Sequence, residues 1–352
     1  MIPLFKVPMS SDAAVAVSRV LRSGYVGQGA IVDEFEAALQ REFQLAVRPI
    51  TTNSCTSAIQ LALMLLNVGP GDEVITTPIT CTATNAPIVL AGARPIWANT
   101  DPNTGNIDPN DVAAKITGRT KAIIAVDWSG RACDYTRLRR FGIPVIQDAA
   151  HGPLTPFGGD LVCLSFGPIK HLTCGDGGAL VVYDPEMSRQ ARLLRWYGLD
   201  RTGTKSFRCE QNIERVGTKL HMNDINASMG LANLPRLAEI VRRHRQNALL
   251  LDALIQLRPE LTKPAMDHTS CWWVYTLTVI DRPSFQAYMS LHGIEASQVH
   301  ARNDKHTGFH YPNGPLPGVD LFDKTQISIP CGWWLSNEEV RHIAWAVNTW
   351  NH

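Results

Sequence analysis

The stretch LSFGPIKHLTCGDGGALVVYD, residues 164 to 184, places a single lysine between two contrasting patterns. Lys170 follows an apolar run at 161–166 that is typical of a buried strand. It precedes three glycines, at 175, 177 and 178, which allow close approach of backbone to a neighbour. A solvated lysine on a surface turn is the ordinary interpretation of such a residue. The alternative is a reactive amine, because burial lowers the pKa of lysine and makes it nucleophilic.

Around this stretch, strand and helix patterns alternate along the chain. Apolar strand-like runs lie at 73–77, 94–97, 121–126, 144–147 and 161–166. Helical spacing of apolar residues lies at 15–21, 31–43, 56–66 and 82–90. Strands separated by helices predict a mainly parallel sheet with crossover helices, and therefore an α/β fold.

The pattern changes after residue 185. A long helical segment is predicted over 223–254, and the segments 272–279 and 339–350 indicate a smaller α+β unit at the end of the chain. We therefore expect a large domain over 1–240 and a small C-terminal domain over 241–352.

The composition disfavours several kinds of partner. The 352 residues include 33 basic and 32 acidic ones, for a net charge of +1, so no field of one sign would attract nucleic acid or an anionic membrane. The first residues lack the pattern of a secretory signal, and no apolar run is long enough to span a bilayer. Eight scattered cysteines without a C-x-x-C pair are typical of reduced thiols. We expect a cytoplasmic globular protein.

Two further stretches fall where a strand would meet a helix. The residues TNSCTS at 52–57 open a predicted helix, whose free N–H groups and positive dipole end would bind a phosphate. Ordinary N-capping by serine or threonine is the simpler alternative. In VIQDAAH at 145–151, Asp148 ends an apolar strand and His151 follows three residues later. A carboxylate there would hold the protonated ring nitrogen of a heterocycle, with an N-cap again as the alternative.

The order of these features along the chain is informative. A phosphate site, a carboxylate at a strand end and a lysine after a later strand are the three anchors of pyridoxal 5'-phosphate. The helix N-terminus would bind the phosphate, Asp148 would pair with the pyridinium nitrogen, and Lys170 would condense with the aldehyde. Each feature alone has an ordinary explanation, whereas all three in this order favour the cofactor.

Several segments also resemble one family, the DegT/DnrJ/EryC1/StrS sugar aminotransferases. They are SGYVGQGAIVDEFE (23–36), GPGDEVITTP (69–78), DAAHG (148–152), SFGPIKHLTCGDGGA (165–179) and KLHMNDINASMGLANLPRL (219–237). The resemblance extends over essentially the whole chain. It implies a fold-type I pyridoxal phosphate transferase with a mainly parallel seven-stranded sheet, active as a homodimer whose active sites are built from both subunits.

The resemblance implies roles for individual residues. Lys170 is then the Schiff-base lysine and general acid/base, Asp148 pairs with the pyridinium nitrogen, and His151 lies near the ring hydroxyl of the cofactor. The side chain at residue 81 contacts the cofactor ring. The implied phosphate ligands are Ser54, Cys55, Thr56, Ser165 and, from the neighbouring subunit, Lys219.

This chain departs from the family pattern at four positions. Cys55 stands where glycine is usual, and Cys81 stands where an aromatic residue usually stacks on the cofactor ring. Cysteine is a smaller and more polarizable contact. Lys219 replaces a commoner asparagine, and Asp176 replaces glutamate.

The implied reaction has two halves. An amino acid, glutamate in our expectation, leaves its amino group as pyridoxamine 5'-phosphate, and the amine then passes to the keto group of a nucleotide-linked sugar. A 4-keto-6-deoxyhexose is the usual acceptor, and the segments HMNDINA and ARND are similar to perosamine-type members that use GDP. The candidate substrate-binding residues are Gly27, Gln28, Trp128, His300, Arg302, Asn303 and His306. For the polar loop at 298–306, a solvated turn is the alternative.

Three other functions were weighed. A sugar 3-dehydratase of the same fold has histidine in place of the lysine, whereas here His171 is only adjacent to Lys170. A regulatory protein that keeps the fold is disfavoured because Asp148, Ser165 and Lys170 are all retained. A nicotinamide oxidoreductase needs a G-x-G-x-x-G turn that the first βα junction lacks. Asp304, His306 and His310 match no common zinc spacing, so no metal is expected.

Overall fold

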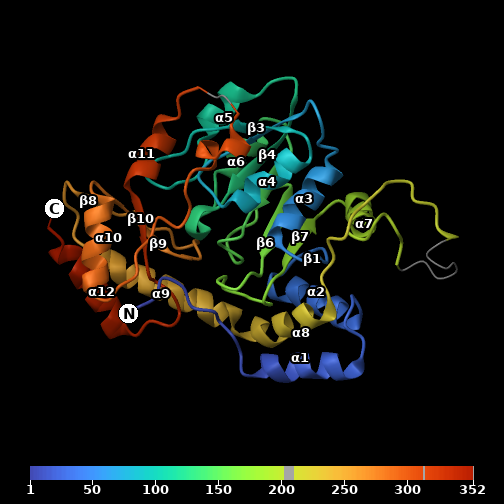
Figure 1. The fold of residues 1–352 in the computed structure, drawn as a ribbon, viewed down its shortest axis with the longest axis horizontal. Coiled ribbons are helices and arrows are strands. Elements are labelled where there is room, and N and C mark those ends of the chain that lie inside the picture. Colours follow the sequence, from blue (N-terminus) through green and yellow to red (C-terminus); the bar gives the residue numbers. More distant parts are fainter. Residues whose placement is uncertain (202–209, 312–313, 352) are drawn as a thin grey trace.

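The computed structural model describes residues 1–201, 210–311 and 314–351 (Figure 1). Its largest element is a seven-stranded sheet with the strand order β1-β7-β6-β5-β4-β2-β3. The strands are β1 (Ile50–Thr52), β2 (Glu73–Thr76), β3 (Arg94–Trp97), β4 (Thr120–Val126), β5 (Val145–Asp148), β6 (Leu161–Ser165) and β7 (Gly178–Val182). Strands β2 to β6 are parallel, and β7 is antiparallel to both β6 and β1. This confirms the mainly parallel seven-stranded sheet.

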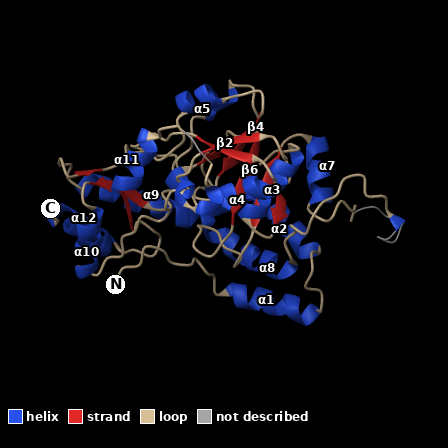
Figure 2. Ribbon diagram, turned by 45° about the horizontal axis from the view of Figure 1, so that its top comes forward, coloured by secondary structure: helices blue, strands red, loops and turns tan. Residues whose placement is uncertain are grey.

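Helices cover both faces of this sheet, as Figure 2 shows. They are α1 (Asp12–Ser23), α2 (Ala30–Glu42), α3 (Cys55–Leu65), α4 (Thr82–Leu90), α5 (Pro109–Lys115), α6 (Tyr135–Arg139), α7 (Pro185–Leu194) and α8 (Asp224–Asn233). Alternate residues of a strand serve opposite faces. In β6, Leu161 and Cys163 pack in the cluster of α3 and α7, whereas Val162 and Leu164 pack in the cluster of α2 and α8. The buried strands are therefore apolar on both sides.

A second, antiparallel sheet has the order β10-β9-β8. Its strands are β8 (Leu261–Thr262), β9 (Tyr275–Val279) and β10 (Gln326–Ile329), and the helices in this part are α9 (Leu237–Leu254), α10 (Arg282–Leu291), α11 (Pro317–Thr325) and α12 (Asn337–Thr349). One end of α9 packs in the large part through Leu237 and Val241, and the other packs in the small part through Ala248 and Leu251. The expected boundary at 240/241 falls inside this shared helix, and the division into two domains stays a prediction.

Two elements differ from the expected ones. The helical segment expected over 223–254 is divided, because Pro235 lies in a 3₁₀ turn, Leu234–Arg236, between α8 and α9. The strand expected over 272–279 begins only at Tyr275. Trp272 has a φ of 49°, which is incompatible with a strand.

The state of the cysteines and the presence of membrane-spanning helices can be examined within the described ranges. The cysteines there are free thiols, and all but Cys81 are buried; Cys209 lies outside the described residues. No helix in these ranges is both long enough and apolar enough to cross a membrane.

Candidate active site

The predicted site residues converge at the carboxyl ends of neighbouring parallel strands. Asp148 ends β5, Ser165 ends β6, and Trp128 follows β4 in the 3₁₀ turn Trp128–Gly130. Asp148 pairs in register with Val126 on one side and with Cys163 on the other. In open α/β sheets this edge is where ligands bind.

Asp148 is buried at this edge, and other side chains hold its carboxylate. Its Oδ2 accepts a hydrogen bond of 2.8 Å from the hydroxyl of Thr84, and its Oδ1 accepts one of 3.1 Å from the backbone N–H of Ala150. The thiol of Cys55 lies 3.8 Å from Oδ1. Burial raises the pKa of Asp148, and the Thr84 and Ala150 donors oppose that rise. Thr84 is not among the predicted site residues, since it lies in the first turn of α4 with no local motif.

Lys170 lies in an arch between β6 and β7 that is closed at its base. The backbone N–H of Phe166 donates to the carbonyl of Gly177 at 2.8 Å, and that of Cys174 donates to the carbonyl of Phe166 at 3.0 Å. Burial lowers the pKa of the Lys170 amine to about 8, and the charge of Asp148 opposes this fall. An amine with this pKa is partly neutral near pH 8, as a nucleophile or base must be.

The N-terminus of α3 is the candidate anion site. Ser54 caps the helix by accepting a hydrogen bond of 3.1 Å from the N–H of Ser57. The first N–H groups of a helix have no partner within it, so those of Cys55 and Thr56 are the donors that Ser54 does not satisfy. A Cβ on Gly178 would lie 2.5 Å from the N of Cys55, so β7 passes against this helix end. Ser165 pairs in register with Gly178 and so borders the same place.

Two neutral histidines lie beside the lysine. The His151 ring stacks on that of Trp273, with centroids 4.0 Å apart, and its Nε2 lies 3.4 Å from Nε2 of His300. The N–H of Ser129 donates to His151 Nδ1 at 3.3 Å. Burial holds the pKa of His151 well below its usual value and lowers that of His300 to about 3. Trp128 faces both rings edge-on.

Cys81 precedes α4 and is exposed.

Two residues of the polar loop have roles that differ from those expected. The Arg302 guanidinium donates to both oxygens of Asp304, at 2.7 and 2.6 Å, and also to Asp320 in α11. Asn303 is buried, and its amide bonds Asn85 and the carbonyl of Thr80. These side chains tie the loop to the fold, and their contact with a substrate stays a prediction. His306 is exposed.

Three other predicted residues have contacts with neighbouring parts of the same chain. The carbonyl of Gly27 accepts from the N–H of Asp224, and that of Gln28 accepts from Arg201 at 2.8 Å. Lys219 is exposed, and its carbonyl accepts from the amide of Asn53 at 3.5 Å. These contacts do not involve Lys170 or Asp148.

The comparisons with known proteins decide the class. The model of the DegT/DnrJ/EryC1/StrS aminotransferase family matches residues 9–348. The chain belongs to this family. This confirms the pyridoxal phosphate-dependent sugar aminotransferase of fold type I that the sequence predicted.

Several known proteins are similar to this chain over nearly its full length. The chain is 30% identical over 362 residues to the spore coat polysaccharide biosynthesis protein SpsC of Bacillus subtilis, covering 94% of this chain and 92% of SpsC. It is 38% identical to AtS13 from Actinomadura melliaura, with a TM-score of 0.93 and coverage of 99% and 98%. It is 35% identical to the sugar aminotransferase CalS13 from Micromonospora echinospora, with a TM-score of 0.94 and coverage of 99% and 100%.

The residues present fit the cofactor of this family. The helix end at Cys55 and Thr56 suits its phosphate, and the close passage of Gly178 leaves no room there for a larger residue. Asp148 would hold the ring nitrogen, and the Lys170 amine would meet the aldehyde. Within the described ranges, no group of three or more potential metal ligands is found.

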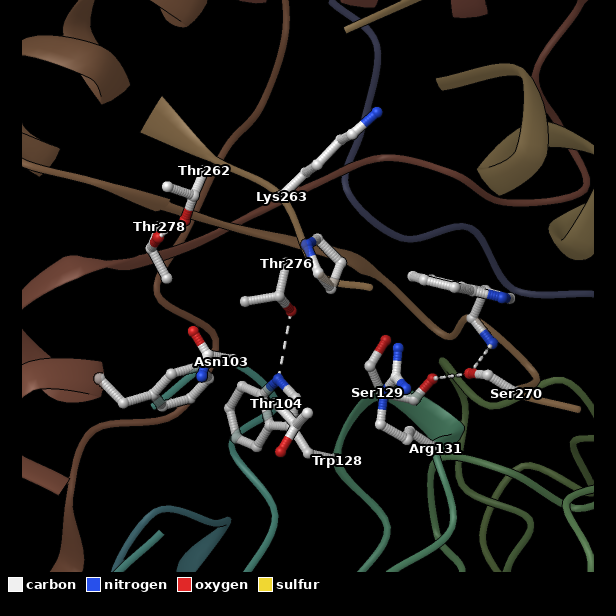
Figure 3. Close-up of a pocket in the computed structure, with 13 residues that line it drawn as sticks. Asn103, Thr104, Trp128, Ser129, Arg131, Thr262, Lys263, Ser270, Thr276 and Thr278 are labelled. Atoms are coloured by element: carbon white, nitrogen blue, oxygen red, sulfur yellow. Dashed lines mark hydrogen bonds between the residues drawn. The ribbon is translucent and has the colours of Figure 1, made fainter. Parts of the chain in front are cut away.

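A small cavity lies behind Trp128, on the side of the second sheet (Figure 3). Its volume is about 30 Å³, which has room for about one water. Thr262, Thr276 and Thr278 line it from β8 and β9, and the indole N–H of Trp128 donates to the Thr276 hydroxyl at 3.2 Å. A sugar does not fit there.

Proposed function

We propose that the protein transfers an amino group from L-glutamate to the keto group of a nucleotide-linked 4-keto-6-deoxyhexose, with pyridoxal 5'-phosphate as cofactor. The observation that carries the proposal is the placement of the Lys170 amine. It lies at the strand ends, near the Asp148 carboxylate and the open N-terminus of α3. When bound, the cofactor supplies an aldehyde that condenses with amines and a ring that withdraws electrons.

Individual residues of this chain have different roles in the proposed reaction. Asp148 keeps the ring nitrogen protonated, because a carboxylate held by Thr84 and Ala150 is a strong acceptor. Lys170 takes a proton from the donor amino acid and returns one to the acceptor, which its pKa of about 8 permits near neutral pH. His300 is neutral, its Nε2 lies 3.4 Å from that of His151, and it would hydrogen-bond a sugar oxygen.

The side chain of His171 favours transamination over dehydration. It is buried, and its Nε2 lies 3.1 Å from the carbonyl of Cys271. Because this nitrogen already has the Cys271 carbonyl as a hydrogen-bond partner, His171 is poorly placed to replace Lys170. The 3-dehydratase alternative therefore has less support.

A homodimer in the cytoplasm is part of the proposal. Val15, Leu21 and Tyr25, from α1 and the loop after it, are exposed. Val15 and Tyr25 also line a groove between α1, α2 and α8. A second copy would cover this apolar surface. In such a dimer, Gln28 and Lys219 would contribute to the site of the neighbouring subunit.

Absorption spectroscopy tests the first half of the reaction. The purified protein is reconstituted with pyridoxal phosphate, its visible band is recorded, and L-glutamate is added. We expect the band to give way to that of pyridoxamine phosphate. Lys170→Ala should lack the original band, whereas Lys324→Ala, which changes an exposed lysine of α11, should behave as wild type. A folded protein that binds no pyridoxal phosphate would overturn the proposal.

The acceptor is tested separately. The pyridoxamine form is mixed with a GDP-linked or a thymidine diphosphate-linked 4-keto-6-deoxyhexose, and the amino sugar is detected by mass spectrometry. We expect turnover with the GDP-linked sugar, on the resemblance of the segment at 221–227 to perosamine-type members. Turnover of only the other nucleotide sugar would contradict that choice while leaving the transaminase intact.

A further inference from the structure

Two residues with left-handed backbone meet where the large part of the molecule contacts the second sheet. Ser129 has a φ of 58° and Trp272 a φ of 49°. Such conformations cost non-glycine residues of order 1–3 kcal/mol and persist only where the surroundings fix them. The N–H of Trp273 donates to the carbonyl of Ser129 at 3.0 Å, and the Ser129 hydroxyl donates to the carbonyl of Val274. The two unusual residues therefore form one joint.

Several side chains fix the backbone of Trp272 in this joint. Its carbonyl lies 2.8 Å from Nδ1 of His244 and accepts from the Cys331 thiol at 3.0 Å. Its indole N–H donates to the carbonyl of Asp267 at 2.9 Å. This backbone leads directly into Trp273, so the joint determines where the Trp273 indole lies.

The Trp273 indole lies against the reactive amine. It is 2% exposed, and the Nζ of Lys170 lies 3.7 Å from the centroid of its ring. Its N–H donates to the carbonyl of Ile169, the residue before the lysine, at 2.9 Å. His151 stacks on it with centroids 4.0 Å apart, and Phe5 stacks on it at 4.7 Å. The ring is thus held from several sides in contact with the amine.

We propose that Trp273 is a positioning residue for Lys170, which holds the amine over its ring and stabilises the protonated form by a cation–π contact. The proposal deepens the proposed function, since it rests on the use of Lys170 as the reactive amine.

The physical effect has a definite sign. Burial lowers the pKa of the amine, whereas the electron-rich face of an indole favours the cation. Replacing the indole with an aliphatic side chain removes this stabilisation. The pKa of Lys170 should then fall by about half a unit to one and a half units, the range that cation–π energies of partly to fully desolvated pairs correspond to. Phenylalanine keeps the aromatic face and should preserve most of the effect.

The experiment measures the amine directly in the full chain freed of cofactor. Lys170 is acetylated with a trace of acetic anhydride between pH 6 and 10, and the modified peptide is quantified by mass spectrometry to give its titration midpoint. Trp273→Leu and Trp273→Met should lower the midpoint, and Trp273→Phe should leave it within a few tenths of a unit. Trp345→Leu changes an exposed tryptophan of α12 and serves as the matched control.

Other outcomes overturn the proposal. Equal shifts in the Phe and Leu variants would assign the effect to the lost hydrogen bond with Ile169. An unchanged or raised midpoint in the aliphatic variants would exclude a stabilised cation. Circular dichroism identifies variants that fold, and the Met variant, with a long flexible side chain, provides the measurement if Leu does not fold. Because no cofactor is present, failure here is distinguishable from failure of the transaminase proposal.

Discussion

Thr84 illustrates how one buried hydroxyl contributes to the site at the scale of a single residue. Its Oγ1 lies 2.8 Å from Oδ2 of Asp148 and 2.9 Å from the hydroxyl of Thr80. A neutral hydroxyl that donates to a carboxylate stabilises the charged form and fixes the direction of its lone pairs. Thr84 therefore prepares Asp148 for a protonated ring nitrogen.

Replacing Thr84 with valine keeps the shape and removes the donor. Hydrogen bonds to charged groups contribute about 1.5–3 kcal/mol, so Thr84→Val should weaken pyridoxal phosphate binding about tenfold to a hundredfold. The dissociation constant is measured by titrating the cofactor-free protein and following absorbance. Thr84→Ser, which retains the hydroxyl, should bind nearly as wild type. Equal affinities for wild type and Thr84→Val would show that Asp148 does not need this donor.

The sequence is sufficient to predict some of the site residues but not others. Asp148 and Lys170 could be predicted because each lies at the end of a recognisable apolar strand. Thr84 and Trp273 could not, since their importance arises from contacts with residues 64 and 104 positions away in the chain. From the sequence alone, Arg302 and Asn303 are candidate donors to a substrate. The sequence does not show that Asp320 and Thr80 lie beside them and accept their hydrogen bonds.

Among the elements, the contact between β7 and the start of α3 determines the shape of the anion site. A Cβ on Gly178 would lie 2.5 Å from the N of Cys55 and 2.6 Å from the C of Ser54, and these are backbone atoms that cannot turn aside. A side chain here would push the helix end away from Ser165. The two N–H groups at that end would then no longer point to one place.

Gly178→Ala should therefore harm both stability and cofactor binding. Overpacking of this kind costs about 1–3 kcal/mol of the free energy of unfolding. We expect this loss in urea denaturation, together with weaker binding of pyridoxal phosphate. Gly118→Ala, where an added Cβ meets nothing within 4 Å, is the matched control. A Gly178→Ala variant as stable and as tightly binding as wild type would contradict the contact.

The positions of most helices and strands follow from local patterns in the sequence. Of the two places where an expected element is broken or shortened, one has a signal in the sequence and the other needs the three-dimensional structure. The strand expected at 94–97 matches β3, and the helix expected at 82–90 matches α4. The break between α8 and α9 follows from Pro235, a signal that was available in the sequence. The short start of β9 was not predictable, because the left-handed backbone of Trp272 depends on partners such as His244 and Cys331.

Over the whole molecule, buried histidines make stability depend on pH. Burial lowers the pKa of His244 from 6.5 to about 4, with the contact to the Trp272 carbonyl opposing the fall. The unfolded chain therefore binds a proton before the folded one does. The contribution to stability is complete above about pH 6.5 and is lost as the pH falls toward 4.

His244→Asn tests this dependence. The asparagine amide still donates a hydrogen bond but does not titrate. Between pH 6.5 and 4 the wild type should lose up to about 3 kcal/mol more of its free energy of unfolding than the variant. Urea denaturation at a series of pH values measures the difference. Burial also lowers the pKa values of His151 and His171, so the free energy of unfolding of both proteins should fall in acid. Parallel curves of this free energy against pH would exclude a role for His244.

Subunit mixing tests whether active sites are shared. In the proposed homodimer, Lys170 and Lys219 of one site come from different chains. Lys170→Ala and Lys219→Ala proteins should each be impaired, and a mixture that has exchanged subunits should recover activity, because one site of each mixed dimer is then intact. Light scattering measures the oligomeric state in the same samples. No recovery after verified exchange would place both lysines in a single chain.

The overall architecture was the most predictable feature, because alternation of strands and helices is a property of the chain itself. The order of the strands was not visible in any local pattern. Pairing of β2 with β4 and reversal of β7 depend on contacts that form only in the folded chain.

The arch that carries Lys170 has a consequence for changing what the enzyme accepts. Both of its ends continue into central strands, and its base is closed by the hydrogen bonds of Phe166 with Gly177 and Cys174. A reactive group mounted in this way is a fixed reference point, to which each new substrate must be fitted. Engineering of substrate range should therefore leave 165–178 untouched and vary the surrounding rim, where Cys81 and His300 face the lysine.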